Sequence, residues 1–399
     1  MIPRPLLERV FSAASMERWN DHPHPRAFTE LGKQAHKMVA AWALGKSEED
    51  RGESVDWDAL IRGGVFEFLH RVVVTDIRPP VFHRLMDDEE TKARLDEWVA
   101  SRLAPELSGF SPSLARDFRE YHRLAEDTLE RRILRAAHYM ATGWEFGFIL
   151  HWGADMYGLD RTRRDVEANL AAIDLPSARE MLDHEDSPLW GFFSLVGQLT
   201  FQKRWARTTR VPQTSVLGHL MFVAVTAWLL SLEADLCPRR VYNNFFGGLF
   251  HDLPEVLTRD IISPIKASVE GLEDMIRRYE HEAMTERVLP LLPESWHEEL
   301  RWYTEEEFSN RTRNPGAIDP IERHEGDIPK GLNEGRYDPI DGHLIEVCDK
   351  LAAYMEAAVS IRTGIHPPEL ENAKQQLYDR FRLARACGLS LGYLVEYFR

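Results

Sequence analysis

The chain has 399 residues, of which 44% are hydrophobic and 29% are charged, and its formal net charge is −16. This composition is typical of a globular protein and excludes a disordered one, while the length favours two domains over one. The acidic balance argues against binding to a nucleic-acid polymer or an anionic membrane, because both need clustered Lys and Arg. Three widely spaced cysteines and an N-terminus without the apolar core of a signal peptide predict a cytoplasmic protein.

Apolar and charged residues recur at helical spacing along most of the chain, which predicts an all-α protein. The clearest expected helices lie at 219–232, 274–292, 343–361 and 373–389, and the best strand candidate is 72–77. The apolar run at 215–232 reaches the lower length limit of a membrane span. We interpret it as a buried core helix, because it contains His219 and is flanked by acidic residues.

Two irregular stretches interrupt the helical pattern. Residues 175–188 are polar with proline near each end, which predicts a linker between domains at 1–180 and 186–399, although one helical turn fits within it. Residues 309–341 are dense in Pro, Gly, Asp and Asn. A loop of this length in a compact domain is usually either functional or disordered, and we favour a lid over a tether.

The two halves of the chain share a motif. Residues 247–264 read GGLFHDLPEVLTRDIISP and residues 63–80 read GGVFEFLHRVVVTDIRPP, with eight identities in eighteen positions. The matches continue on both sides in the same order and pair polar residues of the two copies: His36 with His219, His138 with Asp349, and Glu145 with Glu356. They predict two tandem helical domains related by internal duplication.

The first copy lacks a polar pair that the second copy has. At the positions of His251 and Asp252 it has Glu67 and Phe68. A phenylalanine cannot bind an ion, while the double glycine and the apolar positions are retained, so we expect a first domain without metal that is kept for its packing. A rearranged site in the first copy stays an alternative, built from His36, His70, Asp76, His83 or His138.

Two imidazoles and two carboxylates of the second copy form a candidate metal-binding set: His219, His251, Asp252 and Asp349. Mixed nitrogen and oxygen ligands of this kind suit a divalent ion such as Mn²⁺, Co²⁺, Fe²⁺, Zn²⁺ or Ni²⁺. An ion with open positions lowers the pKa of a bound water toward neutrality. Each of these residues taken singly is more often structural, with its polar group satisfied inside the core.

The segment HDLPEVLTRDIISPIK at 251–266 resembles the signature of the HD-domain metal-dependent phosphohydrolases, and within them the bacterial 5′-deoxynucleotidases. The likeness runs from about Leu189 to Arg362. It implies one divalent ion (Mn, Co, Fe, Zn, Ni or Mg) held by His219, His251, Asp252 and Asp349. It also implies Glu255 as the residue that positions or deprotonates the attacking water, Asp260 as a further acid or base, and Arg204, Trp205 and Lys266 as substrate-binding residues.

The residues themselves support part of this assignment. On a continuous helix Glu255 lies at i+4 from His251 and on the same side. Asp260 has a competing structural role, because Asp76 persists in the copy that lost the ligands and capping of the next helix explains this equally well. The chain departs from the nucleotidase branch beside the first metal histidine and in the long interval before Asp349, which leaves the substrate open.

The sequence therefore predicts a metal-dependent phosphohydrolase of two HD-like helical domains, of which the second is active. The expected substrate is a small phosphorylated nucleotide, most readily a nucleoside or deoxynucleoside 5′-monophosphate. Two alternatives stay open: hydrolysis of another phosphate ester or signalling nucleotide, and a metal-stabilised nucleotide-binding or scaffold protein without turnover. Glu255 favours the enzyme, because a binding protein has no use for a water-activating carboxylate. The sequence is compatible with a homodimer but does not decide the oligomeric state.

Overall fold

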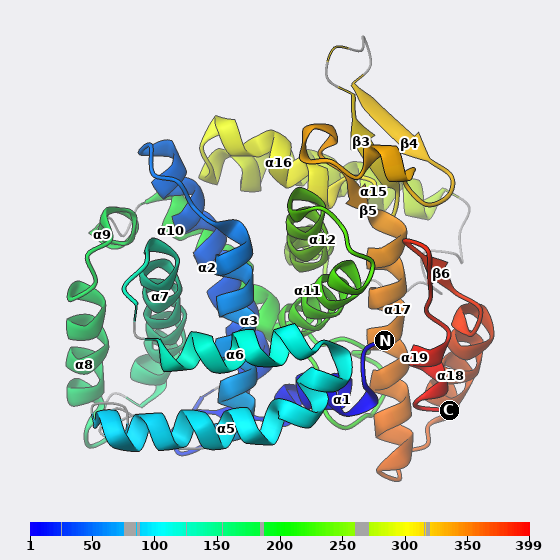
Figure 1. Ribbon diagram of the computed structural model, residues 1–399. Coiled ribbons are helices and arrows are strands. Elements are labelled where there is room, and N and C mark those ends of the chain that lie inside the picture. Colours follow the sequence, from blue (N-terminus) through cyan, green and yellow to red (C-terminus); the bar gives the residue numbers. More distant parts are fainter. Residues whose placement is uncertain are drawn as a thin grey trace. The chain divides into compact units, whose positions relative to one another are not determined.

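Helices make up most of the described residues, which confirms the all-α prediction (Figure 1). The computed structural model describes residues 1–399 except 25, 76–84, 86–87, 125, 154, 184–186, 260–270, 315 and 317–319. The chain divides into two units, Met1–Leu175 and Pro176–Arg399. Part of the predicted linker is helical, because α9 spans Pro176–Asp183.

The first unit combines long helices with one short antiparallel pair of strands. Its elements are α1 (Arg4–Ser12), η1 (Ala13–Ser15), β1 (Glu17–Arg18), β2 (Phe28–Thr29), α2 (Glu30–Asp50), α3 (Trp57–Val74), α5 (Glu89–Phe110), α6 (Pro112–Arg123), α7 (Leu129–Trp152) and α8 (Leu159–Ala171). Thr29 begins α2, because its hydroxyl accepts a hydrogen bond from Gly32 N (3.2 Å). Helices α2 and α3 both pack against α7, and Trp42 is completely buried in the core between them.

The second unit is also helical and carries two small sheets. Its helices after α9 are α10 (Pro188–Gly197), η2 (Gln198–Phe201), α11 (Val216–Glu233), α12 (Pro238–Phe250), α13 (Glu255–Thr258), α15 (Leu272–Ala283), η3 (Met284–Val288), η4 (Leu289–Leu291), α16 (Glu294–Thr304), η5 (Lys330–Leu332), η6 (Gly335–Tyr337), α17 (Gly342–Arg362), α18 (Pro368–Phe381) and α19 (Tyr393–Glu396). Its strands are β3 (Asn310–Arg313), β4 (Ile321–His324), β5 (Ile340–Asp341), β6 (Arg385–Ala386) and β7 (Leu389–Ser390).

Helix α11 lies at the centre of the second unit, with α12 and α17 packed against it (Figure 1). It begins at Ser215, whose hydroxyl accepts a hydrogen bond from Gly218 N (3.1 Å). By length and composition it is the one described helix that could cross a membrane, but 89% of the window that passes this test is buried inside the protein. Its burial on all sides is that of a core helix, as the sequence predicts.

The double glycine of the repeated motif permits close approach of helices. A Cβ atom on Gly248 would lie 3.0 Å from the Cα atom of Ala224, which belongs to the backbone of α11. In the first unit, a Cβ atom on Gly64 would instead meet the flexible end of Met38. Glycine is thus needed at both positions for packing, and the neighbour is more rigid in the second unit.

We expect Gly248→Ala to lower the free energy of unfolding by about 1–3 kcal/mol, as overpacking typically does, because the backbone of α11 cannot move aside. Gly64→Ala is the matched variant and should cost less, because the Met38 side chain can yield and alanine favours the helix by about 1 kcal/mol. Urea unfolding of the full-length variants measures both. Equal losses would contradict the proposed difference between the two neighbours.

The stretch at 309–341 is more ordered than the sequence predicts. Strands β4, β3 and β5 form an antiparallel sheet in that order. The guanidinium of Arg240 donates to both carboxylate oxygens of Asp341 at 2.5 and 2.6 Å, which anchors β5 to α12. The polar and glycine-rich sequence did not indicate these strands, because each strand is only two to four residues long. The role of this segment as a lid stays a prediction.

Two further expectations are wrong. The helix expected at 373–389 ends at Phe381, and β6 and β7 form a hairpin beyond it in which Gly388 has φ of +76°. A positive φ is readily adopted only by glycine, so the turn overrides the helical spacing. The strand expected at 72–77 is not formed in its described part, because Val74 is the last residue of α3.

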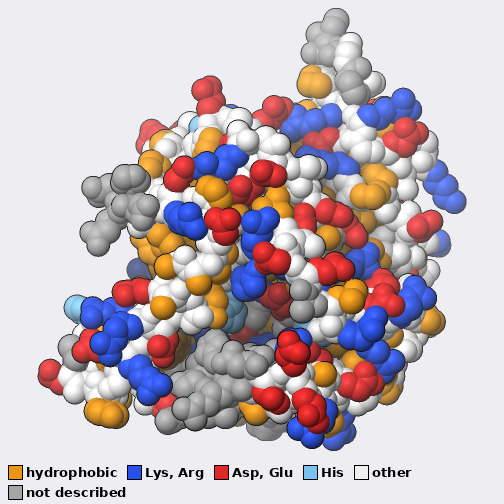
Figure 2. Space-filling model, turned by 60° about the vertical axis from the view of Figure 1, so that its left-hand side comes forward, with side chains coloured by type: hydrophobic (Ala, Val, Ile, Leu, Met, Phe, Trp, Pro, Cys, Tyr) orange, Lys and Arg blue, Asp and Glu red, His pale blue; other side chains and the backbone are white. Residues whose placement is uncertain are grey.

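On the face shown in Figure 2, acidic and basic side chains are interspersed over the described surface. No continuous basic stripe is visible there among the described residues. Binding of a nucleic-acid polymer requires such a stripe to contact successive phosphates.

Candidate metal centre

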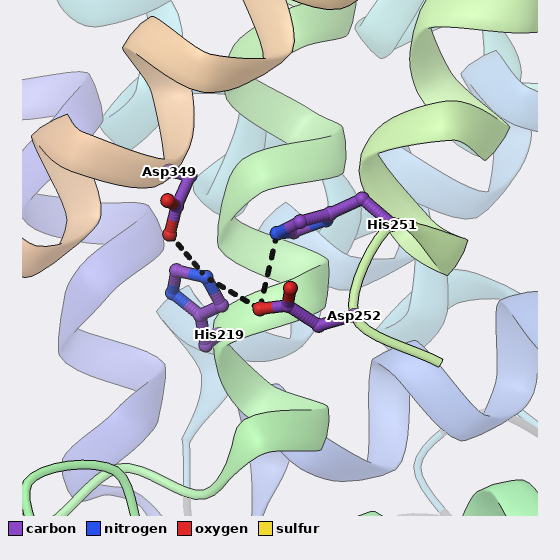
Figure 3. Close-up of side chains that lie close together, drawn as sticks. All are labelled: His219, His251, Asp252 and Asp349. Carbon is purple, nitrogen blue, oxygen red and sulfur yellow. Dashed lines mark ion pairs between the residues drawn. The ribbon is translucent and has the colours of Figure 1, made fainter. Parts of the chain in front are cut away.

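Three helical segments of the second unit bring the four predicted ligands together (Figure 3). His219 lies in the first turn of α11, His251 and Asp252 follow the last residue of α12, and Asp349 lies in α17. One ligand atom from each residue lies within 4.8 Å of the others. Since these segments are far apart in the chain, only the packing of α12 and α17 on α11 places the side chains around one point.

His251 is oriented by its backbone neighbour. Its Nδ1 lies 2.9 Å from the carbonyl oxygen of Gly248, which can only accept, so Nδ1 carries the proton. In a neutral ring Nε2 is then an acceptor, and it lies 3.2 Å from Oδ2 of Asp252. Two acceptors face each other at this distance only if a proton or a metal ion lies between them. A ring nitrogen that donates to a backbone carbonyl while the other faces the ion is the usual arrangement of a metal-bound histidine.

His219 is buried, and its two ring nitrogens lack aligned hydrogen-bond partners among the described residues. Its Nε2 lies 2.9 Å from Oδ1 of Asp349 and 3.9 Å from Oδ2 of Asp252. Burial and the nearby Arg204 guanidinium lower the pKa of His219, which favours the neutral ring that a metal ion requires. A neutral imidazole has one nitrogen lone pair, and Nε2 is the ring nitrogen that faces the carboxylates.

Both aspartates of the cluster are held in the ionised form. Burial acts to raise the pKa of Asp252, but the adjacent His251 outweighs it and lowers the pKa below its ordinary value. Burial also acts to raise the pKa of Asp349, but Lys350, whose Nζ lies 2.7 Å from Oδ2, contributes most to lowering it well below the ordinary value. Two imidazoles and two carboxylates converging on one point fit a divalent cation.

The Arg-Trp pair predicted to bind substrate lies beside this cluster. The guanidinium of Arg204 is 3.6 Å from Asp349 and 3.8 Å from Asp252, measured to the nearest carboxylate oxygens. The indole N–H of Trp205 donates to Oε2 of Glu356 at 2.7 Å. Buried Glu356 also faces Arg204 and the buried Arg210, and together they lower its pKa to about 2 although burial acts to raise it. Glu356 thus holds the pair in place.

The other predicted site residues have different outcomes. Glu255 is buried (8% exposed) at the start of α13. The continuous helix assumed in the sequence argument is absent, because α12 ends at Phe250 and turns connect it to α13. Asp260 and Lys266 lie outside the described residues. The structure thus gives no position for either residue.

Two residues near the cluster were missed by the sequence argument. Lys350 follows the predicted ligand Asp349 in the chain and forms an ion pair with it. The sequence did not single it out, because a lysine on a helix is usually exposed to solvent. Glu307 follows α16 and is partly buried; burial raises the pKa of its carboxyl, and Asp252 raises it further. It belongs to no motif, so its position was not visible before the fold was known.

The first unit also contains a group of metal-ligand residue types, namely His70, Asp96 and His122. Nε2 of His70 lies 2.9 Å from Asp96, and the ammonium of Lys92 donates to the other oxygen of Asp96 at 2.6 Å. A bound lysine competes with any cation for this carboxylate. Of the residues in the alternative site considered above, His70 is the one that belongs to this group, whereas Asp76 and His83 lie outside the described residues.

Comparison with known proteins agrees with the geometry. Residues 196–378 match the family described as HD domain. This segment of the second unit is an HD domain. It is similar to proteins named 5′-deoxynucleotidase, with 23% identity over 192 residues in Photobacterium profundum and 27% over 197 residues in Vibrio vulnificus. Each comparison covers 47% of this chain and 81% of the relative. No solved structure is significantly similar to the chain.

The HD domain lies within the second unit and includes the four clustered residues and the Arg-Trp pair. The first unit lies outside the family match. The family resemblance drawn from the sequence is thereby confirmed for the second unit. The His and Asp cluster of this HD domain has the residue types and the convergence that a divalent ion needs.

Proposed function

We propose that the second unit is a metal-dependent phosphohydrolase that cleaves the phosphate monoester of a nucleoside 5′-monophosphate. The convergence of His219, His251, Asp252 and Asp349 is the observation that carries this proposal. The similarity to 5′-deoxynucleotidases supports the nucleotide as the substrate class. The four residues would hold the ion, which when bound lowers the pKa of water and offsets negative charge on phosphate oxygens.

The residues of the chain divide the remaining work. Glu255 is proposed to accept the proton of the attacking water as the water oxygen bonds to phosphorus. The bond from phosphorus to the 5′ oxygen then breaks, and a proton must return to that oxygen, for which Asp260 stays the candidate. Hydrolysis needs no further reactant than water, and it releases the nucleoside and inorganic phosphate.

Arg204 is proposed to bind the phosphate group. Its guanidinium faces both aspartates of the cluster and is only 12% exposed, so a phosphate on the ion would lie within its reach without full exposure to water. A planar guanidinium matches two phosphate oxygens at once. Glu356 fixes the direction of the side chain, which reduces the entropy lost when substrate binds. Trp205 is proposed to offer a ring face to the base or sugar.

The decisive experiment is a phosphate-release screen of the full-length chain over nucleoside and deoxynucleoside 5′-monophosphates, with Mn²⁺, Co²⁺, Fe²⁺, Zn²⁺, Ni²⁺ and Mg²⁺ added one at a time. The expected result is release that depends on the ion and disappears with a chelator. Bound metal without release from any phosphate ester would favour the alternative of a metal-stabilised binding protein. Release from a different phosphate ester alone would keep the chemistry and change the substrate.

We expect Arg204→Ala to raise KM for the phosphate substrate by about 10-fold to 100-fold, because a hydrogen bond to a charged group contributes about 1.5–3 kcal/mol. Arg207→Ala is the control, since Arg207 is an exposed arginine in the same loop. Steady-state kinetics of phosphate release measures both variants, and circular dichroism checks the fold. An unchanged KM in Arg204→Ala would show that this guanidinium serves only to pair with the carboxylates.

A further inference from the structure

The first unit repeats the framework of the metal centre. Trp19 and Trp205 both have a positive φ, 57° and 56°, which is rare for an aromatic residue. Each indole N–H donates to a buried glutamate on a long helix, Trp19 to Glu145 on α7 (2.8 Å) and Trp205 to Glu356 on α17 (2.7 Å). In both units the preceding arginine contacts the same glutamate. A backbone conformation of this kind costs free energy and persists only where the surrounding structure stabilises it.

The helix that follows repeats the same geometry and gives the register of the two copies. Thr29 begins α2 and Ser215 begins α11, each by accepting from the backbone N–H three residues later. Each is also bridged in antiparallel fashion to the residue before the Arg-Trp pair. Counting from these caps, Lys33 occupies the position of His219. The sequence alignment that paired His36 with His219 is therefore wrong in register.

The contacts of Lys33 agree with this position. Its Nζ donates to Nδ1 of His138 at 2.6 Å, and His138 is the residue aligned with Asp349. In the second unit the corresponding atoms, His219 Nε2 and Asp349 Oδ1, lie 2.9 Å apart. An amine thus replaces the imidazole that would hold the ion, and a histidine replaces the carboxylate.

The other positions of the cluster also differ between the two units. The residues that the first unit has at these positions cannot hold a metal ion. In the motif alignment Arg71 stands at the position of Glu255, and buried Phe68 at that of Asp252. Glu67 stands at the position of His251, but its carboxylate accepts from Lys37 and from Tyr121. With Arg18, the first site has four cationic side chains (Lys33, Lys37, Arg71 and Arg18) beside the three carboxylates of Glu30, Glu67 and Glu145.

Lys33 is a buried amine, 2% exposed, that makes no ion pair among the described residues. The carboxylates of Glu30 and Glu145 act on it at longer range, and Glu30 itself pairs with Arg18 and Arg71. Burial, Arg18 and Lys37 lower the pKa of Lys33 well below its ordinary value, although Glu30 and Glu145 oppose them. A buried ammonium is costly unless an anion pairs with it.

We propose that the first unit binds a phosphate monoester dianion, such as a nucleoside 5′-monophosphate, without a divalent ion and without hydrolysing it. Lys33 would take the place of the ion against the phosphate, and Arg18 and Arg71 would add guanidinium contacts. The side chains of Arg71 and Glu67 remain 25% and 34% exposed, so this part of the site is in contact with solvent. Hydrolysis is absent because Arg71 cannot accept the proton of water. The ligand class rests on the function proposed for the second unit.

The experiment uses the full-length Arg204→Ala chain in the presence of EDTA, so that the phosphate site of the second unit is impaired. Isothermal titration with inorganic phosphate and with dAMP should give about one binding site per chain. Lys33→Met, added to this chain, should weaken binding at least about 10-fold, because it removes a charged hydrogen bond from a buried site. Arg71→Gln should also weaken binding, which provides a second test if Lys33→Met does not fold.

Lys46→Met is the matched control, because Lys46 lies on the same helix and pairs with Glu49 away from the cluster. It should leave phosphate affinity unchanged. The inference would be overturned if the Arg204→Ala chain bound no phosphate in EDTA. It would also be overturned if adding Lys33→Met or Arg71→Gln left the phosphate affinity of that chain unchanged. Lys33-dependent binding together with no phosphate release under any ion would refute the proposed function alone, whereas release without EDTA-resistant binding would refute the inference alone.

Discussion

Asp252→Asn in the full-length chain is expected to lose its bound divalent ion and its phosphohydrolase activity together. The amide keeps the shape of the side chain but removes the charge that faces His251 and His219 at 3.2 and 3.9 Å. Substitution of residues that merely support metal ligands costs about 10-fold to 100-fold in metal affinity, so loss of a direct ligand should cost at least about 100-fold. Metal analysis after dialysis and phosphate release measure the two effects.

Asp274→Asn is the control for this experiment, because Asp274 is an exposed carboxylate in the first turn of α15. It should retain both metal and rate. Full metal occupancy and an unchanged rate in Asp252→Asn would contradict the assignment of the site. The doubly substituted chain, His251→Ala with Asp252→Ala, should contain no metal. An ion that remains there and is lost on changing His70 would place it in the group of His70, Asp96 and His122.

Glu255→Gln is expected to retain the ion and lose about 10²-fold to 10⁴-fold in kcat, which is the range of general base catalysis. The backbone of Glu255 is held independently of its carboxylate, since its N–H donates to the carbonyl of Asp252 (3.1 Å) and its own carbonyl accepts from Gln202 (2.9 Å). The substitution should therefore remove a base without moving the neighbouring ligand. Metal content, circular dichroism and single-turnover rates separate these effects.

Two other outcomes of Glu255→Gln are informative. Loss of metal equal to that of Asp252→Asn would make Glu255 a ligand. Retention of the full rate would make it a structural carboxylate, and Glu307 would become the next candidate, because it is partly buried and its carboxyl interacts electrostatically with Asp252. Glu273→Gln, on the exposed first turn of α15, controls for removal of a glutamate elsewhere.

The candidate metal-binding residues were accessible from the sequence because they belong to short local patterns. His251 and Asp252 are adjacent, and the apolar residues around His219 and Asp349 mark helices that must be buried. Packing was less accessible. The pairing of His36 with His219 rested on sequence similarity alone. The register that we infer for the two units rests on the hydroxyl caps at Thr29 and Ser215, which lie close to Lys33 and His219 in the chain.

By itself, the sequence determined the helical class, the HD motif and the residue types of the candidate site, because helical periodicity and motif spacing are properties of neighbouring residues. Only the tertiary structure decided which side chains share one point. The packing of α12 and α17 on α11 joins residues from three segments, and Glu307 and Lys350 enter the site through it. It also supplies the helix caps and strand bridges from which we infer that Lys33 stands where the second unit has His219.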